Sequence, residues 1–322
     1  MTMSNLKDYI SEVQSHKSLP DEIEDVLLGL AEAAKKIAKL AAANGLDTPN
    51  LGQLAGGQNE DGDSQKQLDV LADNLVYEAL SAAGIGTYFS EEKAEADIIM
   101  PDGVLGVACD PLDGSSNIDT NLTIGTIFSI FKMTDCVNGL PPMGRKQQAA
   151  GLFVYGPQTA LLLSFGDEVA AFALSEVGDF MRLDWDVQIP VTSAEFAINA
   201  SNAAFWPAPI QTYIAERTTG SGAKISGMRW LGSLVADAFR IFRRGGVFLY
   251  PQDSRKGYEQ GRLRLIYEAS PMAFLIEAAG GRATTGTTAI LDVVPTSLHQ
   301  RIPLIFGSAD EVQLITSQIA KS

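Results

Sequence analysis

The segment that most constrains this chain is Asp-Pro-Leu-Asp-Gly-Ser-Ser-Asn, residues 110–117, which directly follows the apolar run Val104–Cys109. A short apolar run next to turn residues is typical of a buried strand, so Asp110 is expected where that strand emerges. Asp113 follows after a turn stiffened by proline. Two carboxylates that converge at a strand end repel each other, and a cation between them offsets that repulsion.

The residues after Asp113 add groups that bind phosphate. Gly114 favours a tight turn, Ser115 and Ser116 carry hydroxyls, and backbone N–H groups at the start of a helical turn attract anions. The alternative is a turn whose side chains only cap a helix. That interpretation suits an isolated Asp-x-x-Asp, but the complete octet after a strand favours a site that combines metal ligation with phosphate binding.

The charge balance excludes several kinds of partner. The chain of 322 residues holds 24 Lys and Arg against 39 Asp and Glu, a net charge of −15. Nucleic acid and anionic membranes require clustered positive charge, so we expect neither as a partner. The N-terminus is charged where a signal peptide needs an apolar core, and no apolar run reaches the length of a membrane-spanning helix. These features predict a cytoplasmic location.

Cysteine and histidine are too few for the sites they usually build. Cys109 and Cys136 cannot form a disulfide framework or a cysteine zinc site. His16 and His299 are the only histidines, which argues against a histidine-rich metal site. A metal in this protein is therefore expected to be a hard cation held by oxygen ligands.

Hydrophobic periodicity predicts an α/β protein. Short apolar runs typical of strands fill residues 86–183, and strands alternate with helices beyond residue 195. The polar stretch Asp184–Pro190 is the predicted boundary between domains at 1–187 and 188–322. The stretch Leu51–Gln65 is polar, glycine-rich and without periodicity, which favours a functional loop that closes over the site.

Further carboxylates follow other predicted strands. Glu91 and Glu92 close the run TYFS just upstream of the octet, and Glu268 ends the run LRLIYE, which we interpret as another strand. Parallel neighbouring strands present their carboxyl ends at one edge of a sheet, so these side chains are expected to meet the two aspartates of the octet. Five carboxylates in one place suffice for two or three Mg²⁺ ions.

Several longer segments accompany these motifs, in a consistent order: SEE, DPLDGSSNID, RWLGSLVADAFR, GGVFLYP, GRLRLIYEASPMAF and AAGG…ATTG…LDVVPTSLHQR. Together they resemble class I fructose-1,6-bisphosphatase from about residue 20 to the C-terminus. The resemblance is specific, because inositol monophosphatase-like enzymes share the D-x-x-D-G-[ST] pattern but not LRLIYE or FLYP. It implies a layered αβαβα fold of that wider type. An N-terminal domain would carry the metal and catalytic motifs and regulatory helices, a C-terminal domain would bind the sugar phosphate, and the enzyme would be a homotetramer.

The resemblance also implies roles for individual residues. The implied Mg²⁺ ligands, for which Mn²⁺ is a possible substitute, are Glu91, Glu92, Asp110, the Leu112 carbonyl, Asp113 and Glu268. The implied contacts to the C1 phosphate are Asp113, Gly114, Ser115 and Ser116. The implied contacts to the C6 phosphate are Asn199, Tyr250, Arg262 and, from a neighbouring subunit, Arg229, while Arg264 matches a basic residue near the metals.

The resemblance also implies which residues activate the attacking water. Asp69 and Glu92 match the groups that activate the attacking water, and Asp63 matches the acidic residue of the mobile loop. Without the resemblance, both aspartates would be assigned to the surface. Three positions depart from the family's commoner pattern: Trp230 stands where a Tyr is usual, Arg262 replaces a Lys, and Ala200 follows Asn199 where an acidic residue is common. All three differences concern the distal phosphate rather than the reaction.

The reaction implied is Mg²⁺-dependent hydrolysis of the C1 phosphate of fructose 1,6-bisphosphate to fructose 6-phosphate and phosphate, in gluconeogenesis or the Calvin cycle. The nearest alternative is a sugar bisphosphatase of the same fold that acts on sedoheptulose 1,7-bisphosphate, or on both substrates. A different class of alternative is a catalytically silent scaffold or a metal-dependent phosphate sensor. The presence of every carboxylate that the chemistry needs argues against that class.

Overall fold

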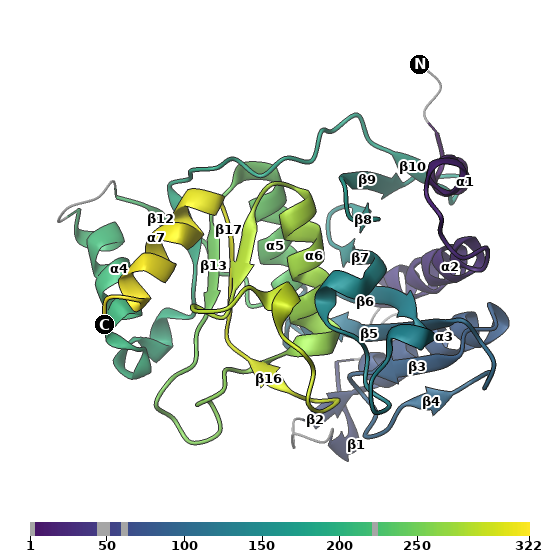
Figure 1. Ribbon diagram of the computed structural model, residues 1–322, viewed down its shortest axis with the longest axis horizontal. Helices are drawn as coiled ribbons and strands as arrows, with labels where there is room; N and C mark the ends of the chain where they lie inside the picture. Colours follow the sequence, from purple (N-terminus) through teal and green to yellow (C-terminus); the bar gives the residue numbers. More distant parts are fainter. Residues whose placement is uncertain (1–3, 44–51, 59–63, 221–224) are drawn as a thin grey trace.

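Eight strands form the larger of two main sheets in the computed structural model, which describes residues 4–43, 52–58, 64–220 and 225–322 (Figure 1). Their order across the sheet is β10-β9-β8-β7-β6-β5-β3-β4, and β3 and β5 are its parallel pair. The strands are β3 (Thr87–Ser90), β4 (Asp97–Ile98), β5 (Leu105–Asp113), β6 (Ile124–Lys132), β7 (Gln147–Tyr155), β8 (Thr159–Ser164), β9 (Val169–Leu174) and β10 (Phe180–Arg182).

This sheet is buried on both faces because successive side chains of its central strands point to opposite faces and most of them are apolar. In β5, Val107 and Cys109 pack toward one core, and Ala108 packs toward the other. The first core is completed by the three N-terminal helices, α1 (Leu6–His16), α2 (Ile23–Ala42) and α3 (Gln67–Ala82). Their buried apolar residues recur at helical spacing, as Leu6, Tyr9 and Ile10 do in α1.

The second main sheet has the strand order β12-β11-β13-β17-β15. Its strands are β11 (Glu195–Ala197), β12 (Gly227–Met228), β13 (Val247–Tyr250), β15 (Arg282–Thr284) and β17 (Leu304–Gly307). Helices α5 (Leu234–Arg244) and α6 (Ser270–Ala278) fill the space between the two sheets, and α4 (Ala208–Thr219) and α7 (Ala309–Ile319) cover the outer face (Figure 1). The layers run helix, sheet, helix, sheet, helix, which confirms the αβαβα architecture. The division into domains at 1–187 and 188–322 stays a prediction.

Short elements complete the described chain. The 3₁₀ turns are η1 (Ser115–Asn117), η2 (Met133–Asp135), η3 (Gly144–Lys146), η4 (Ala200–Phe205) and η6 (Ile290–Asp292). Strands β14 (Leu263–Arg264) and β16 (Arg301–Ile302) pair with each other in a small antiparallel sheet.

The polar stretch at 51–65 contains regular structure that its sequence does not indicate. β1 (Leu54–Gln58) and β2 (Ser64–Lys66) pair antiparallel, with Leu54 opposite Lys66. The role of the stretch as a loop that closes over the site stays a prediction, whereas the lack of regular structure that the missing periodicity indicates is wrong for these residues. The reason is that backbone hydrogen bonds make the hairpin, while Leu54 is 61% exposed and Ala55 is also exposed, so no apolar alternation marks the strands.

The interpretation of LRLIYE as a strand is also wrong. Only Leu263 and Arg264 are extended; Leu265–Ala269 form a π-helical turn, η5, that runs directly into α6. A short apolar run suits a buried strand and a buried helical turn equally well, and all five residues of η5 are buried between the sheets. Glu268 therefore lies on a helical turn and not at a strand end.

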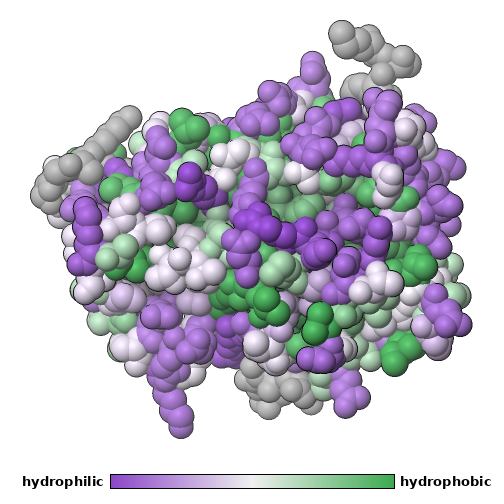
Figure 2. Space-filling view, in the orientation of Figure 1, coloured by the Kyte–Doolittle hydropathy of each residue, from purple (hydrophilic) through white to green (hydrophobic). Residues whose placement is uncertain are grey.

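The surface is mixed in polarity. On the face in Figure 2, hydrophobic residues appear as separate groups among hydrophilic ones. In the described part of the chain, no helix is both long and apolar enough to cross a bilayer.

Candidate active site

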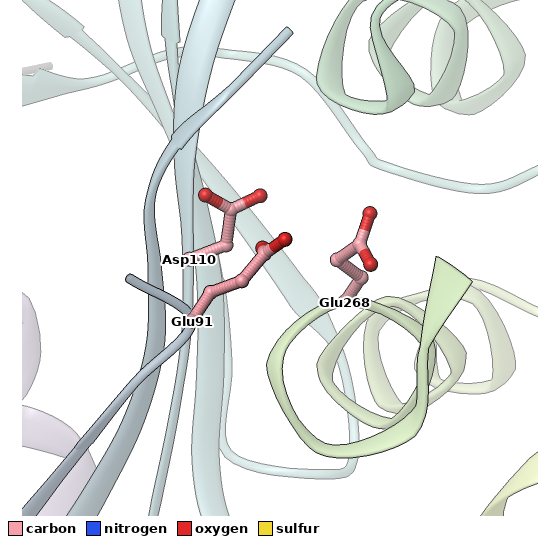
Figure 3. Close-up of side chains that lie close together, drawn as sticks. All are labelled: Glu91, Asp110 and Glu268. Atoms are coloured by element: carbon pink, nitrogen blue, oxygen red, sulfur yellow. The ribbon is translucent and has the colours of Figure 1, made fainter. Parts of the chain in front are cut away.

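Three carboxylates from distant parts of the chain meet at one edge of the larger sheet. Glu91 follows β3, Asp110 lies within β5, and Glu268 comes from η5. Each contributes an oxygen, and these oxygens all lie within 4.8 Å of one another (Figure 3). The parallel pairing of β3 with β5 brings the first two together, and the Glu91 backbone N–H continues that pairing by donating to the Cys109 carbonyl at 3.0 Å. The predicted convergence of β3 and β5 is confirmed, with Glu268 arriving from a helical turn instead of a third strand.

These carboxyl groups are held close together away from water. Burial raises the pKa of Glu91, Asp110 and Glu268 above the usual carboxyl values, and the charge of Glu91 raises the pKa of the other two further. Among the described residues, Glu91 Oε2 is a buried oxygen without a hydrogen-bond partner. A buried, unpartnered carboxylate oxygen facing two other carboxylates suits a hard divalent cation.

Arg264 compensates part of this negative charge. It is 3% exposed, its guanidinium contacts Glu91 Oε1, and its backbone N–H donates to Glu268 Oε2 at 2.6 Å. The guanidinium lowers the pKa of Glu91 against the larger effect of burial. The structure thus brings the predicted basic residue directly into the acidic cluster.

Asp113 lies beside this cluster and faces α5. Its Oδ2 accepts hydrogen bonds from the Ser233 hydroxyl and the Val235 backbone N–H, both at 2.9 Å. Burial raises the pKa of Asp113 to about 6, while those two donors lower it. Leu112, between the two aspartates, donates its backbone N–H to Asp110 Oδ1 at 3.0 Å and so fixes the direction of that carboxylate.

A second pair of carboxylates flanks the first cluster. Asp69 begins α3, is only 3% exposed, and accepts the Lys66 backbone N–H on Oδ2 at 2.7 Å. Burial and then the charge of Glu92 raise the pKa of Asp69 to about 7. Within the described chain, Asp69 Oδ1 is buried and makes no hydrogen bond. Asp69 is therefore not the surface residue that its sequence context alone indicates. Asp63, its expected companion, lies outside the described residues.

The turn after Asp113 requires a glycine. Gly114 has φ of +79°, and a Cβ at that position would lie 2.7 Å from Ser233 Cβ. Ser115 and Ser116 follow in η1, so the turn lies against the start of α5. Asn117 also connects this turn to the segment before α5, because its Nδ2 donates to the Leu231 carbonyl at 3.1 Å.

Only some of the residues assigned to the distal phosphate line one small hollow. Asn199 and Tyr250 line the same small hollow, and Asn199 Oδ1 accepts from the Ser201 hydroxyl at 2.6 Å. Arg262 donates to the Tyr258 hydroxyl at 2.6 Å and lowers the pKa of Tyr250 against the larger effect of burial. Arg229 contacts the Met228 carbonyl at 3.2 Å, and its role across a subunit boundary stays a prediction.

The sequence interpretation missed two residues near the site. Ser233, which contacts Asp113, is 120 positions away from it, and only a helix-start pattern marks it. Tyr258, which contacts Arg262, stands in a polar loop without periodicity. The first contact depends on the tertiary structure, whereas the second joins residues four positions apart in a loop whose sequence has no periodicity to predict it.

Two family models together match most of the chain. Residues 4–184 match the family description "Fructose-1-6-bisphosphatase, N-terminal domain", and residues 189–320 match its C-terminal domain. A class 1 fructose-1,6-bisphosphatase of Nitrobacter hamburgensis is 50% identical over 90% of this chain and 85% of its own. That of Paracoccus denitrificans is 48% identical over 93% of this chain and 91% of its own.

A solved structure agrees with these sequences. The fructose-1,6-bisphosphatase of Leishmania major in its holo form superposes with a TM-score of 0.91 and 30% identity, and the match covers 99% of each chain. The similarity of sequence and the similarity of fold to these enzymes therefore both extend over nearly the entire chain, including the elements that carry the converging carboxylates. On this evidence the chain belongs to the class 1 fructose-1,6-bisphosphatases, a family of phosphoric monoester hydrolases.

Proposed function

We propose that this protein hydrolyses the C1 phosphate of fructose 1,6-bisphosphate in a Mg²⁺-dependent reaction that yields fructose 6-phosphate and phosphate. One observation carries the proposal: three carboxylates, of which Asp110 and Glu268 are buried and Glu91 is partly exposed, have oxygens within 4.8 Å of one another. They lie beside a further pair, Asp69 and Glu92. The first set suits a divalent cation and the second suits proton transfer. Phosphoryl transfer to water needs both functions in one place.

The proposed cation ligands are the three converging carboxylates with Glu92, Asp113 and the Leu112 carbonyl. Buried carboxylates with raised pKa values and an unpartnered Glu91 Oε2 support this assignment. When bound, Mg²⁺ supplies positive charge that stabilises the phosphoryl oxygens and the departing sugar oxygen as the bond breaks. Mn²⁺ accepts the same oxygen ligands and is a possible substitute.

Asp69 and Glu92 are the proposed proton acceptors for the attacking water. A general base works best when its pKa lies near the working pH, and the pKa of Asp69 is raised to about 7. Its buried Oδ1 has no hydrogen-bond partner among the described residues, so it is available to a water molecule. The Lys66 backbone N–H holds the other oxygen and keeps the carboxylate oriented.

The substrate is proposed to lie between these carboxylates and the distal hollow. Asp113, Gly114, Ser115 and Ser116 would contact the C1 phosphate, and Asn199, Tyr250 and Arg262 the C6 phosphate. A homotetramer with Arg229 reaching a neighbouring subunit, a cytoplasmic location and a role in gluconeogenesis or the Calvin cycle complete the proposal.

Phosphate release tests this function directly. The protein is assayed with fructose 1,6-bisphosphate, sedoheptulose 1,7-bisphosphate and fructose 6-phosphate, each with Mg²⁺ and with EDTA. We expect release from the first substrate only with Mg²⁺, and little from fructose 6-phosphate. Faster release from sedoheptulose 1,7-bisphosphate would replace the proposed substrate, and equal release with EDTA would contradict the proposed metal.

A further inference from the structure

Behind the active site, one buried carboxylate gathers hydrogen bonds from three directions. Asp73 lies on α3, one helical turn after Asp69, and is 5% exposed. Its Oδ1 accepts from the Tyr88 hydroxyl at 2.8 Å and from the Ser90 hydroxyl at 2.6 Å. Its Oδ2 forms an ion pair with Lys93 Nζ at 3.3 Å. Nothing in the proposed reaction uses this group.

Two of the hydrogen-bond and ion-pair partners of Asp73, Ser90 and Lys93, flank the two glutamates of the site in the sequence. Ser90 directly precedes Glu91 and Glu92, and Lys93 directly follows them. The Glu92 backbone N–H donates to Ser90 Oγ at 3.2 Å, and the Ser90 hydroxyl donates in turn to Asp73. A chain of two hydrogen bonds thus runs from the Glu92 backbone to a helix on the other side of the turn.

This arrangement sets the position of the turn more strictly than apolar packing could. Hydrogen bonds have a preferred length and direction, and a buried carboxylate that loses one of its donors is left partly unsatisfied. The same helix carries Asp69 on its preceding turn. The spacing between Asp69 and the two glutamates therefore depends on how the turn at 90–93 is attached to α3.

We propose that Asp73 is a positioning residue for the active site: it attaches the Ser90–Lys93 turn to α3 and so fixes Glu91 and Glu92 for the cation and for Asp69. The inference rests on the proposed function, because it assigns the turn to a cation site. Asp73 itself touches neither cation nor substrate. It acts through Ser90 and Lys93.

The test is Asp73→Asn, with Mn²⁺ affinity measured by calorimetry on the full-length protein. The amide keeps the shape but replaces the carboxylate by one neutral acceptor oxygen and an NH₂ donor, which weakens the hydrogen bond from Ser90 and removes the charge that pairs with Lys93. Loss of a group that orients metal ligands usually lowers metal affinity or activity about 10–100-fold, and we expect a loss of that size here. The KM for fructose 1,6-bisphosphate at saturating Mg²⁺ should stay within about twofold of wild type, since Asp73 acts on the metal side of the site.

Asp97→Asn is the matched control. Asp97 on β4 pairs with the same Lys93 Nζ at 2.7 Å, but it makes no contact with Ser90 in the described structure. Its replacement removes an ion pair of Lys93 and leaves the attachment to α3 intact. We expect its Mn²⁺ affinity to stay within about twofold of wild type. An equal loss in both variants would show that the charge of Lys93 matters and not the attachment, and would overturn the inference.

Ser90→Ala keeps the test decisive if Asp73→Asn folds poorly. This small change breaks the chain of hydrogen bonds to Glu92 without touching the Asp73 charge. We expect Ser90→Ala to lower Mn²⁺ affinity by itself, and the double variant to lose little more than the worse single variant, because both act through one path. Fully additive losses would contradict a shared path.

The two proposals fail in different ways. A wild-type protein that neither binds Mn²⁺ nor releases phosphate would refute the proposed function. A wild-type protein that does both, together with unchanged Mn²⁺ affinity in Asp73→Asn and Ser90→Ala, would refute only the role of Asp73.

Discussion

Asp69 illustrates how surroundings change the chemistry of a residue that looks ordinary in the sequence. Its position in the first turn of α3 buries it, and Glu92 adds a second negative charge nearby. Both effects favour the protonated form and raise its pKa to about 7, whereas an unfolded Asp titrates near about 4. Between these values the folded protein holds a proton that the unfolded chain has already released.

The pKa of Asp69 predicts a pH-dependent stability in the metal-free protein. Because the folded state binds the extra proton, the contribution of Asp69 is fully present below pH 4 and is lost as the pH rises to about 7. Asp69→Asn cannot ionise and should escape this loss. We expect its Tm in EDTA to exceed that of wild type by an amount that grows from pH 5 to pH 8. Thermal melts of exposed Asp102→Asn serve as the control, and a pH-independent difference for Asp69→Asn would contradict the assignment.

Glu92 is the residue whose proposed role is most directly tested by activity. Glu92→Gln keeps the size of the side chain but removes the carboxylate that would accept a proton. We expect kcat to fall about 10²–10⁴-fold, the usual effect of a lost general base, with the fold retained. Glu95→Gln, an exposed neighbour, should behave like wild type. Activity of Glu92→Gln within a few-fold of wild type would exclude the role.

Substitution of Arg262 is expected to affect substrate binding more than the chemical step. Its proposed phosphate is remote from the bond that breaks, so Arg262→Ala should raise KM more than it lowers kcat. Some loss of kcat is expected, because binding at the far end helps to orient the reacting end. The half-exposed Arg145, which pairs with Asp292 and Glu277, provides a control of equal charge. A normal KM in Arg262→Ala would remove this residue from the distal site.

At the scale of elements, the sequence predicts what depends on periodicity and misses what depends on tertiary contacts. The strand β5 and its parallel neighbour β3 are predicted because their apolar runs are flanked by polar turns. Glu268 is predicted as a site residue, but its element is wrong, because LRLIYE suits a strand and a buried turn alike. The helical turn brings the Glu268 carboxylate back to the Arg264 backbone N–H four residues earlier, a contact that an extended strand could not make.

The contact between Asp113 and α5 likewise joins elements that are distant in the sequence. Ser233 is the N-cap of α5, accepting from the Ala236 N–H at 3.4 Å, and its hydroxyl also donates to Asp113. The two roles make α5 part of the support for Asp113, a proposed cation ligand. The sequence does not indicate this contact, since Asp113 comes from another layer of the fold.

Ser233→Ala should therefore affect stability and metal binding together. Loss of an N-cap costs about 0.5–2 kcal/mol of unfolding free energy, and we expect a loss in that range by urea denaturation. Asp113 also loses a donor to its ionised form, so a few-fold higher Mg²⁺ concentration should be needed for half-maximal activity. The exposed Ser254→Ala should change neither quantity. A stable Ser233→Ala with an unaltered Mg²⁺ requirement would contradict this link.

At the scale of the whole molecule, the acidic cluster lies where the layers meet. Glu91 and Asp110 belong to the larger sheet, and Glu268 belongs to the helical layer between the sheets (Figures 1 and 3). In the metal-free state burial is the main cause that raises the pKa values of these three carboxyl groups, and nearby like charges raise them further, so the ionised groups repel one another where the layers meet. A bound cation would reverse that repulsion and hold two layers of the fold together.

Mg²⁺ should accordingly stabilise the entire protein and not only its active site. A ligand that binds only the folded state adds about 2.7 kcal/mol when present at 100 times its Kd, which corresponds to a rise in Tm of several degrees. Protons compete with the cation for carboxylates whose pKa values are raised, so the rise in Tm should be larger at pH 8 than at pH 6. Calorimetric melts with Mg²⁺ and with EDTA measure this difference. Glu268→Gln should lose most of the rise, whereas the exposed Glu176→Gln should keep it. The same rise at both pH values, or its persistence in Glu268→Gln, would show that Mg²⁺ stabilises the protein at some place other than the junction of the layers.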